Sequence, residues 1–269
     1  MMKKNKDPHL YINFLLMLIL LSPSKTQDFD SPPQTYESSH IDFLHESREI
    51  IDTLKPLDIP ELQKVMKMSE KIAMQMKENI DAFNSPKQIR LSKPALCSYT
   101  GEVFRQFGLD EYTQGDFYEA QRKLVILSGL YGVLKPLDLI EPYRLEMQAK
   151  IAVGNNKNLY DFWRNHVTEN LNTREKECIV NLASQEYFSV IDSKKIEANI
   201  ISPIFLTQNG GTLKNIAIHA KKARGLMANW CVRNRIDKID DLRKFREGGY
   251  EFCKERSHDE NWAFVVCPK

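Results

Sequence analysis

The chain has 269 residues, of which 42% are hydrophobic and 28% are charged. This composition is typical of a globular protein with a buried core and excludes a disordered or fibrous chain. Its 38 basic and 36 acidic residues give a formal net charge of +2. Any surface that binds a polyanion must therefore arise from local clustering of basic residues.

The amino-terminal region allows two interpretations. A basic segment precedes an apolar run over residues 10–21, which has the form of a secretory signal but is too short to span a bilayer. The alternative is a buried first strand over residues 17–22, ended by a turn at Ser22, with Met17 as the initiator. Residues 1–16 would then be an extension, disordered or due to start-site choice. We favour the second interpretation, which predicts a cytoplasmic protein without a membrane association.

Apolar spacing and capping residues predict the next elements in chain order. After a polar loop come helices over residues 41–54, 61–68 (with Pro60 in the first turn) and 70–83 (with Ser69 as the cap). In the third of these, Met74, Met76 and Ile80 are expected to pack. A short strand and turn are predicted over residues 96–101. The segment 116–127 begins as a helix and ends in an apolar run that is either helix or strand.

The second half of the chain alternates in the same way. Helices are predicted over residues 159–171 and 219–236, and strands over residues 178–182, 200–206, 213–218, 249–252 and 262–266, with a hairpin turn at residues 209–211. No internal repeat or linker interrupts this order. The sequence therefore predicts one mixed α/β domain over residues 17–269, with a mixed β-sheet surrounded by helices.

No standard metal, nucleotide or hydrolase fingerprint is present. The five cysteines form no C-x-x-C pair and the six histidines have no zinc-protease spacing. We expect reduced cysteines that act as small hydrophobic residues, and we predict no cofactor. Nothing local proposes a metal site, although one assembled from distant residues stays open.

Polar residues follow the first predicted strand. Ser22, Lys25 and Thr26 lie where α/β folds place ligand contacts, and they suit the oxygens of a phosphate. The alternative is a polar turn with a solvated lysine. Arg144, among the glutamates of segment 141–147, and Ser184 with Glu186 after strand 178–182 are of the same kind. They could line a cleft, and a structural ion pair is the alternative for Arg144.

The segment 127–138 contains two closely spaced glycines. Gly129 and Gly132, with Tyr131 between them, permit a tight hairpin whose backbone N–H groups face outward and bind a phosphate, with Lys135 adding charge. This pattern is similar to the hairpin of helix-hairpin-helix modules. A purely structural turn is the alternative.

The predicted helix over residues 219–236 has basic residues and no acidic one. They are Lys221, Lys222, Arg224, Arg233 and Arg235. Helical spacing predicts an inward stripe of Ala220, Ala223, Met227, Trp230, Cys231 and Asn234. Lys221, Arg224 and Arg235 then fall on one flank beside small residues that would let a nucleic-acid backbone approach. A solvated basic face is the alternative, but such faces usually mix both signs.

Together these motifs resemble the YaaA family of bacterial peroxide-stress proteins. The matching segments are 18–26, 127–139, 142–147, 181–184, 186–188 and 220–227. The resemblance implies a cytosolic α/β protein with its own fold, a positively charged cleft and a helix-hairpin-helix element. It further implies binding of duplex and branched DNA, protection against oxidative DNA damage, and links to recombination repair and iron control, without an established reaction.

Two functions follow as hypotheses. The first is DNA binding without catalysis, with contacts from Lys25, Gly129, Tyr131, Gly132, Lys135, Lys221, Lys222, Arg224 and Arg235. The second is an enzyme acting on a nucleotide or nucleic-acid substrate in a pocket that includes Ser22, Thr26, Arg144, Ser184 and Glu186. The second needs Lys25 and a carboxylate to converge in a concave site.

Overall fold

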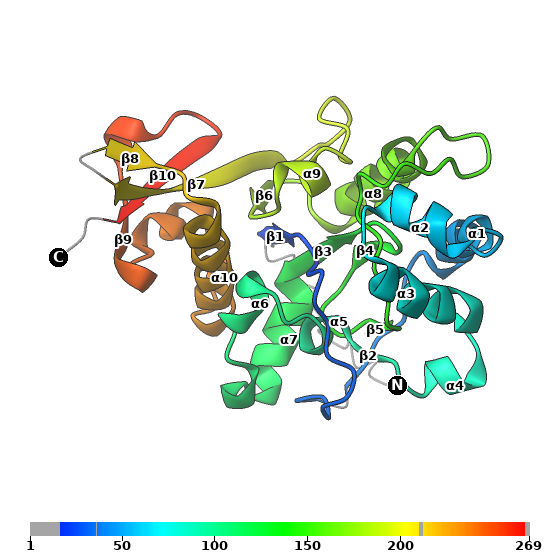
Figure 1. Ribbon diagram of the computed structural model, residues 1–269. Coiled ribbons are helices and arrows are strands. Elements are labelled where there is room, and N and C mark those ends of the chain that lie inside the picture. The colour runs from blue at the N-terminus through cyan, green and yellow to red at the C-terminus, as the bar shows by residue number, and fades with distance from the viewer. Residues whose placement is uncertain (1–16, 36, 210–211, 267–269) are drawn as a thin grey trace, which may run out of the picture.

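Parallel strands form the centre of the molecule, and antiparallel strands close the sheet at both edges (Figure 1). The computed structural model describes residues 17–35, 37–209 and 212–266. Within them the eight strands of the main sheet are β1 (Leu18–Leu21), β3 (Leu124–Ser128), β4 (Gly132–Leu134), β6 (Cys178–Asn181), β7 (Asn199–Asn209), β8 (Thr212–Lys214), β9 (Tyr250–Phe252) and β10 (Asn261–Val266). Their order is β4-β3-β1-β6-β7-β10-β9, and β8 pairs with β7.

The first strand lies in the middle of this order. β1 pairs in parallel with β3 and β6, β6 with β7, and β7 with β10, whereas β4, β8 and β9 are antiparallel to their neighbours. The carboxyl ends of β1, β3 and β6 therefore meet at one edge of the sheet, which is where open α/β sheets bind their ligands. A separate two-stranded sheet joins β2 (Lys93–Pro94) to β5 (Leu139–Ile140).

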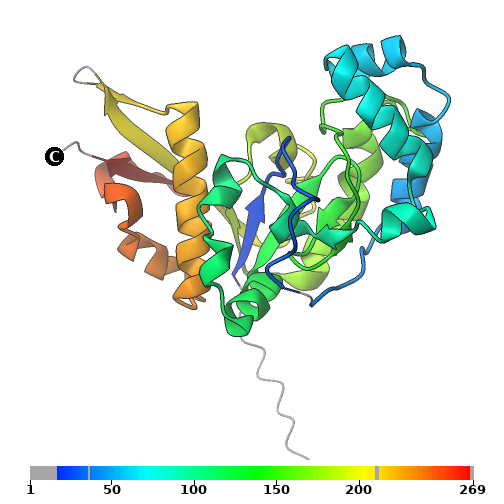
Figure 2. The ribbon, with the colours of Figure 1, turned by 60° about the horizontal axis from the view of Figure 1, so that its bottom comes forward.

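Helices lie on both sides of the central strands and gather beyond the β4 end of the sheet (Figure 1). They are α1 (Leu44–Leu54), α2 (Ile59–Met66), α3 (Glu70–Ala82), α4 (Pro86–Ile89), α5 (Ala95–Ser98), α6 (Glu102–Arg105), α7 (Gln114–Lys123), α8 (Leu159–Arg174), α9 (Gln185–Phe188) and α10 (Ala217–Arg233), with 3-10 helices η1 (Leu109–Glu111), η2 (Ile239–Lys244), η3 (Glu247–Gly249) and η4 (Lys254–Arg256). The views agree that α1–α3 and the β8–β10 region lie at opposite ends of the molecule (Figures 1 and 2). Helix α10 stands between the latter region and α6.

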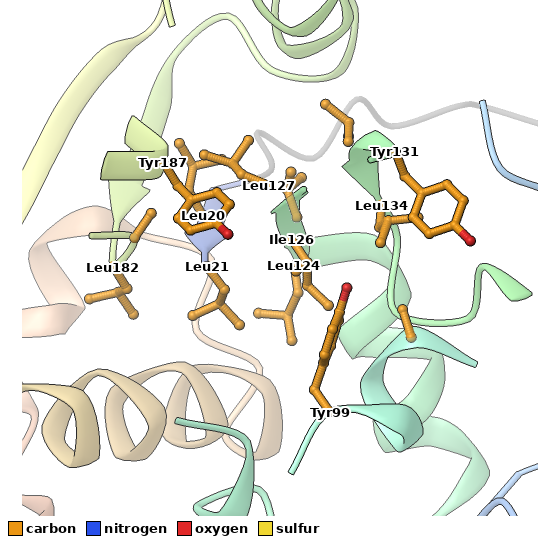
Figure 3. Close-up of a cluster of buried hydrophobic side chains, with 14 of the residues drawn as sticks. Leu20, Leu21, Tyr99, Leu124, Ile126, Leu127, Tyr131, Leu134, Leu182 and Tyr187 are labelled. Carbon is orange, nitrogen blue, oxygen red and sulfur yellow. The ribbon is translucent and has the colours of Figure 1, made fainter. Parts of the chain in front are cut away.

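The core is built on strands that are apolar on both faces. Every residue of β1 and β3 is buried, as expected for central parallel strands covered on both sides. Leucine and isoleucine side chains of these strands meet Leu182 and the rings of Tyr99, Tyr131 and Tyr187 (Figure 3). This rigid layer fixes the carboxyl ends of β1 and β6, from which polar residues project.

Most predicted elements are confirmed, but Asn234, expected on the inward stripe of the helix over residues 219–236, is exposed, and three further details are wrong. Residues Ala95–Ser98 form a helical turn instead of a strand, because Ser98 Oγ donates to the Pro94 carbonyl (2.9 Å) and Ala95 N to the Asp138 carbonyl (2.9 Å). Met74 is 55% exposed and does not pack in the core. The strand expected over residues 213–218 ends at Lys214, and α10 begins at Ala217.

Some expectations concern residues outside the described ones. They are the extension over residues 1–16, the centre of the hairpin turn at 210–211, and Cys267; β7 and β8 do pair as a hairpin requires. No helix in the described part of the chain is long and apolar enough to cross a membrane. Among the described residues, no group of three His, Cys, Asp or Glu side chains is placed to hold a metal ion.

Candidate functional site

A cleft of about 440 Å³ opens at the edge of the sheet where β1 and β6 end. Its walls come from residues 22–27 after β1, residues 101–104 at the start of α6, residues 143–146 and 148 after β5, Leu182, Ser184, Glu186 and Tyr187 after β6, and Lys221 and Arg224 of α10. The structure thus brings together Ser22, Lys25, Thr26, Arg144, Ser184, Glu186, Lys221 and Arg224 from the expected sites. The convergence that the second hypothesis needs is present.

Ser22 and Ser184 join the ends of two neighbouring strands. Ser22 Oγ accepts from the Ser184 backbone N–H (2.8 Å) and donates to Ser184 Oγ (3.2 Å). Ser24 Oγ accepts from the Thr26 backbone N–H, and the two hydroxyl oxygens lie 3.1 Å apart. These hydroxyls therefore hold the floor of the cleft in shape, and the exposed Thr26 is the one nearest solvent.

A lysine and two carboxylates converge on one side of the cleft. Lys25 Nζ lies 2.7 Å from Glu146 Oε1. Gln148 contacts both carboxylates, because its amide Nε2 donates to Glu146 (3.3 Å) and its backbone N–H donates to Glu186 (3.3 Å). Burial raises the pKa of Glu186 and the Glu146 charge adds to the rise, while the Gln148 N–H and Lys25 oppose it. Glu186 is therefore the carboxylate of this group that burial makes harder to ionise.

Two guanidinium groups line the same cleft without an acidic partner. Arg144 and Arg224 form no ion pair among the described residues, and the buried Nε of each has no hydrogen-bond partner there. Burial lowers the pKa of Arg224. The alternative of a structural ion pair between Arg144 and its neighbouring glutamates is wrong, because Glu146 is paired with Lys25 and Glu141 accepts from the Asn84 N–H.

Close backbone approaches position both arginines. A Cβ on Gly225 would lie 2.8 Å from Gln106 Cγ and closer still to the Val103 carbonyl, so only glycine lets α10 lie against α6. A Cβ on Gly129 would lie 2.5 Å from the Leu145 carbonyl, so glycine admits the segment that carries Arg144. The small residue Gly225 therefore packs against the backbone of this same chain. Gly225 and Ala228 are both buried and do not face a nucleic acid.

The prediction that the hairpin at residues 129–132 binds a phosphate through outward-facing N–H groups is wrong. Gly129, Tyr131 and Gly132 are buried, and the N–H groups of Leu130 and Tyr131 donate to Ser128 Oγ (3.2 and 3.1 Å). The Gly129 carbonyl accepts from Trp163 Nε1 (2.9 Å). The segment is a β-hairpin between β3 and β4, and no helix follows in the described chain before α8, so it is not a helix-hairpin-helix element.

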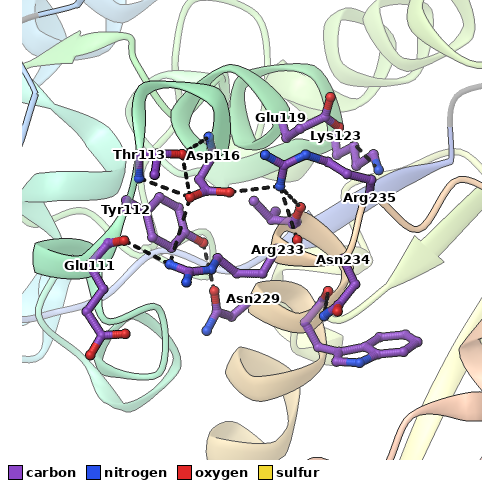
Figure 4. Close-up of polar contacts among 12 residues, drawn as sticks. Glu111, Tyr112, Thr113, Asp116, Glu119, Lys123, Asn229, Arg233, Asn234 and Arg235 are labelled. Atoms are coloured by element: carbon purple, nitrogen blue, oxygen red, sulfur yellow. Dashed lines mark hydrogen bonds and ion pairs between the residues drawn. The ribbon is translucent and has the colours of Figure 1, made fainter.

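Lys135 and Arg235 lie away from the cleft and are neutralised. Lys135 Nζ contacts Asp42 (2.6 Å) and Asp138 (3.7 Å). Arg235 lies beyond the end of α10 and contacts Asp116 at 2.8 Å, as Figure 4 shows, so it does not continue the flank of Lys221 and Arg224. Burial opposes ionisation of Asp116, but hydrogen bonds from Thr113 and the Arg235 charge lower its pKa.

Lys222 points to a different place from its neighbours on α10. It lines a second, smaller cavity with His219, Thr207 and Tyr250, next to β7, whereas Lys221 and Arg224 line the cleft. The cleft also contains residues that were not predicted as site residues, among them Glu146, Gln148, Phe104, Tyr143 and Tyr187. The sequence signal for Glu146 was present, since it lies in the same short segment as Arg144.

Comparison with known proteins gives a consistent assignment. Residues 17–256 match the family model described as peroxide stress protein YaaA. The chain is 41% identical over 256 residues to a UPF0246 protein of Clostridium beijerinckii, covering 93% of this chain and 97% of the relative. It is 37% identical over 253 residues to a UPF0246 protein of Cellvibrio japonicus, covering 93% and 98% respectively. The family model spans most of the chain, and these relatives are similar over almost their whole length, so the chain belongs to the peroxide stress protein YaaA family.

Proposed function

We propose that this protein acts in the peroxide stress response by binding duplex or branched DNA through backbone phosphates at the cleft, and so limits oxidative damage to the DNA. The observation that carries the proposal is the pair Arg144 and Arg224, which line one cleft without a carboxylate partner in the described structure. A guanidinium presents a planar fork of donors that matches a phosphate. Because a half-buried cation without a counter-charge is unfavourable, a phosphate in the cleft would stabilise both.

The charges around the cleft favour an anion over a cation. Lys25, Arg144, Lys221 and Arg224 face three glutamates. One of these, Glu102, lies 3.7 Å from Arg105, and it also accepts a hydrogen bond from Gln106 Nε2 (3.2 Å). Lys221 is exposed and forms no ion pair with another described residue. Lys221 and Arg224 lie three residues apart on α10, so they present charge on the same face of the helix.

Salt-titrated binding of labelled DNA to single-charge variants tests this function. Fluorescence anisotropy with duplex and junction DNA is measured for wild type, Lys221→Gln and Arg224→Gln. The matched control is Lys222→Gln, which removes the same charge from the same helix but on the side of the other cavity. A lost phosphate contact weakens binding across sequences and reduces the slope of log K against log salt by about 1.

We expect that reduction for Lys221→Gln and Arg224→Gln and almost none for Lys222→Gln. Equal losses for all three variants would mean that α10 acts by general charge and that the cleft is not the binding site. Failure of the wild-type protein to bind any of the DNAs at low salt would refute the DNA-binding function itself.

A second candidate function is catalysis on a nucleotide or nucleic-acid substrate in the same cleft. It is favoured by the contact of Lys25 with Glu146 and by the link from Gln148 to Glu146 and Glu186. Two carboxylates held in different environments are the usual basis of an acid and base pair. Incubation of nucleotides and oligonucleotides with wild type and Glu186→Gln, followed by mass spectrometry, tests it. A product formed by wild type and lost in the variant supports catalysis.

A further inference from the structure

We propose that the cleft takes up a single nucleoside monophosphate unit, with its phosphate between Arg144 and Arg224 and its base against the aromatic wall of Phe104, Tyr143 and Tyr187. Within DNA this unit is a nucleotide turned out of the base stack. The inference rests on the proposed function, because it names the part of the nucleic acid that enters the site.

The size of the cleft selects one unit. At about 440 Å³ it falls in the range of pockets that enclose one small molecule. A duplex carries a negative charge every ~1.7 Å of its axis, so a cleft of this size contacts only a short stretch of its backbone. Among the predicted cations, Lys135 and Arg235, which could have extended this contact, are each paired with an aspartate. What remains at the cleft suits one or two phosphates.

The aromatic part of the cleft lining suits a base. Phe104, Tyr143 and Tyr187 line the cleft together with aliphatic side chains. The Tyr143 hydroxyl is held by Tyr99 (2.7 Å) and Ser128 (2.8 Å), so its ring has a fixed orientation. A site for inorganic phosphate alone has no need of aromatic surface, whereas an unstacked base is commonly held by aromatic and apolar side chains.

The carboxylates give the ligand a direction. Glu146 and Glu186 repel a phosphate, so the anionic end of the ligand must lie with the arginines and a neutral end must lie with the glutamates. Carboxylates accept hydrogen bonds from the amino groups of bases, and the Gln148 side chain adds an amide beside them. The ligand that fits this cleft has an anionic end and an aromatic end that donates hydrogen bonds. A nucleotide has both of these ends.

Competition binding separates the free from the strand-bound form of this unit. The labelled probes are a fully paired duplex and the same duplex with one bulged nucleotide. Each is titrated with wild-type protein and then displaced with a free mononucleotide, the matching nucleoside, or inorganic phosphate. Because a bulged nucleotide is already partly unstacked, extrusion costs less than the few kcal/mol of a paired one.

We expect the bulged duplex to bind about tenfold more tightly than the paired duplex, and the mononucleotide to displace it at concentrations where nucleoside and phosphate do not. Arg144→Gln and Glu186→Gln should abolish the preference for the bulge, and Lys222→Gln should keep it. Equal binding of both duplexes, without displacement by the mononucleotide, would overturn the inference while leaving DNA binding intact. Binding of the mononucleotide without binding of either DNA would support the site and refute the proposed function.

Discussion

Replacing Gly225 by alanine tests whether the close approach of α10 to α6 shapes the cleft. The added Cβ would meet Gln106 Cγ at 2.8 Å and Cβ at 2.9 Å, and would meet the Val103 carbonyl oxygen closer still. Rotation of the Gln106 side chain cannot relieve the contacts with its Cβ or with a backbone carbonyl, so a helix has to move. Overpacking of this kind costs about 1–3 kcal/mol, and we take the upper end, about 3 kcal/mol, for this site.

The intrinsic preference of a helix for alanine opposes this cost. Inside a helix alanine is favoured over glycine by about 1 kcal/mol. The net expectation for Gly225→Ala is therefore a loss of about 2 kcal/mol in the free energy of unfolding, measured by urea denaturation. For a chain near this size the melting temperature should fall by about 4–8 °C.

The control is Gly115→Ala in α7, where the new Cβ would lie 3.4 Å from Arg235 Nη2 and 3.7 Å from Thr113 Oγ1. Those are ordinary contacts, so stability should stay the same or rise by up to about 1 kcal/mol. If Gly225→Ala proves as stable as wild type, α6 is free to move away from α10 and the glycine does not set the width of the cleft.

Three further outcomes are expected. Gly132→Ala should lower the free energy of unfolding, measured by urea denaturation, by about 2 kcal/mol more than Gly154→Ala. Both glycines have positive φ, so the backbone strain is shared. A Cβ on Gly132 would lie 2.6 Å from the Trp163 ring, whereas one on Gly154 would meet nothing within 4 Å. Lys123→Met should cost about 3 kcal/mol in the same assay, because the fully buried ammonium contacts Glu119 and Asp237, whereas exposed Lys244→Met should cost less than about 1 kcal/mol. Burial raises the pKa of Asp138 to about 6, although Ser39 and Lys135 oppose the rise. The folded state therefore binds the proton of the Asp138 carboxyl more tightly than the unfolded chain does. Relative to Asp138→Asn, the stability of the wild type should fall as the pH rises from about 4 to about 6.

The buried strands were predictable because their signal is local. β1 is a continuous apolar run, and such runs are buried on both faces in a parallel sheet. The apolar run of β3 is equally buried, but its sequence suits a helix or a strand, and the pairing with β1 decides for the strand. The turn at Ala95–Ser98 was not predictable, because its apolar residues suit a strand equally well. The choice is made by bonds to Pro94 and Asp138, and the second of these lies far along the chain.

The candidate site was predictable in its residue types and less so in their arrangement. The residues after β1 and β6 were correctly expected to meet, since parallel strands bring their carboxyl ends together. The sequence did not show which basic residues would remain unpaired, because their acidic partners lie far away along the chain. Asp42 pairs with Lys135, and Asp116 pairs with Arg235. Glycines indicated close approach, but only the fold shows that the approaching group is a backbone carbonyl of the same chain.

The walls of the cleft come from both halves of the chain, from Ser22 behind the first strand to Arg224 in the last long helix. A nascent chain emerging from the ribosome therefore carries Arg144 before its partner arginine exists, and the ligand gains its full set of contacts only after α10 has docked. Since a ligand that binds only the native state stabilises the whole of it, occupancy of this one cleft should protect distant segments from proteolysis at the same time.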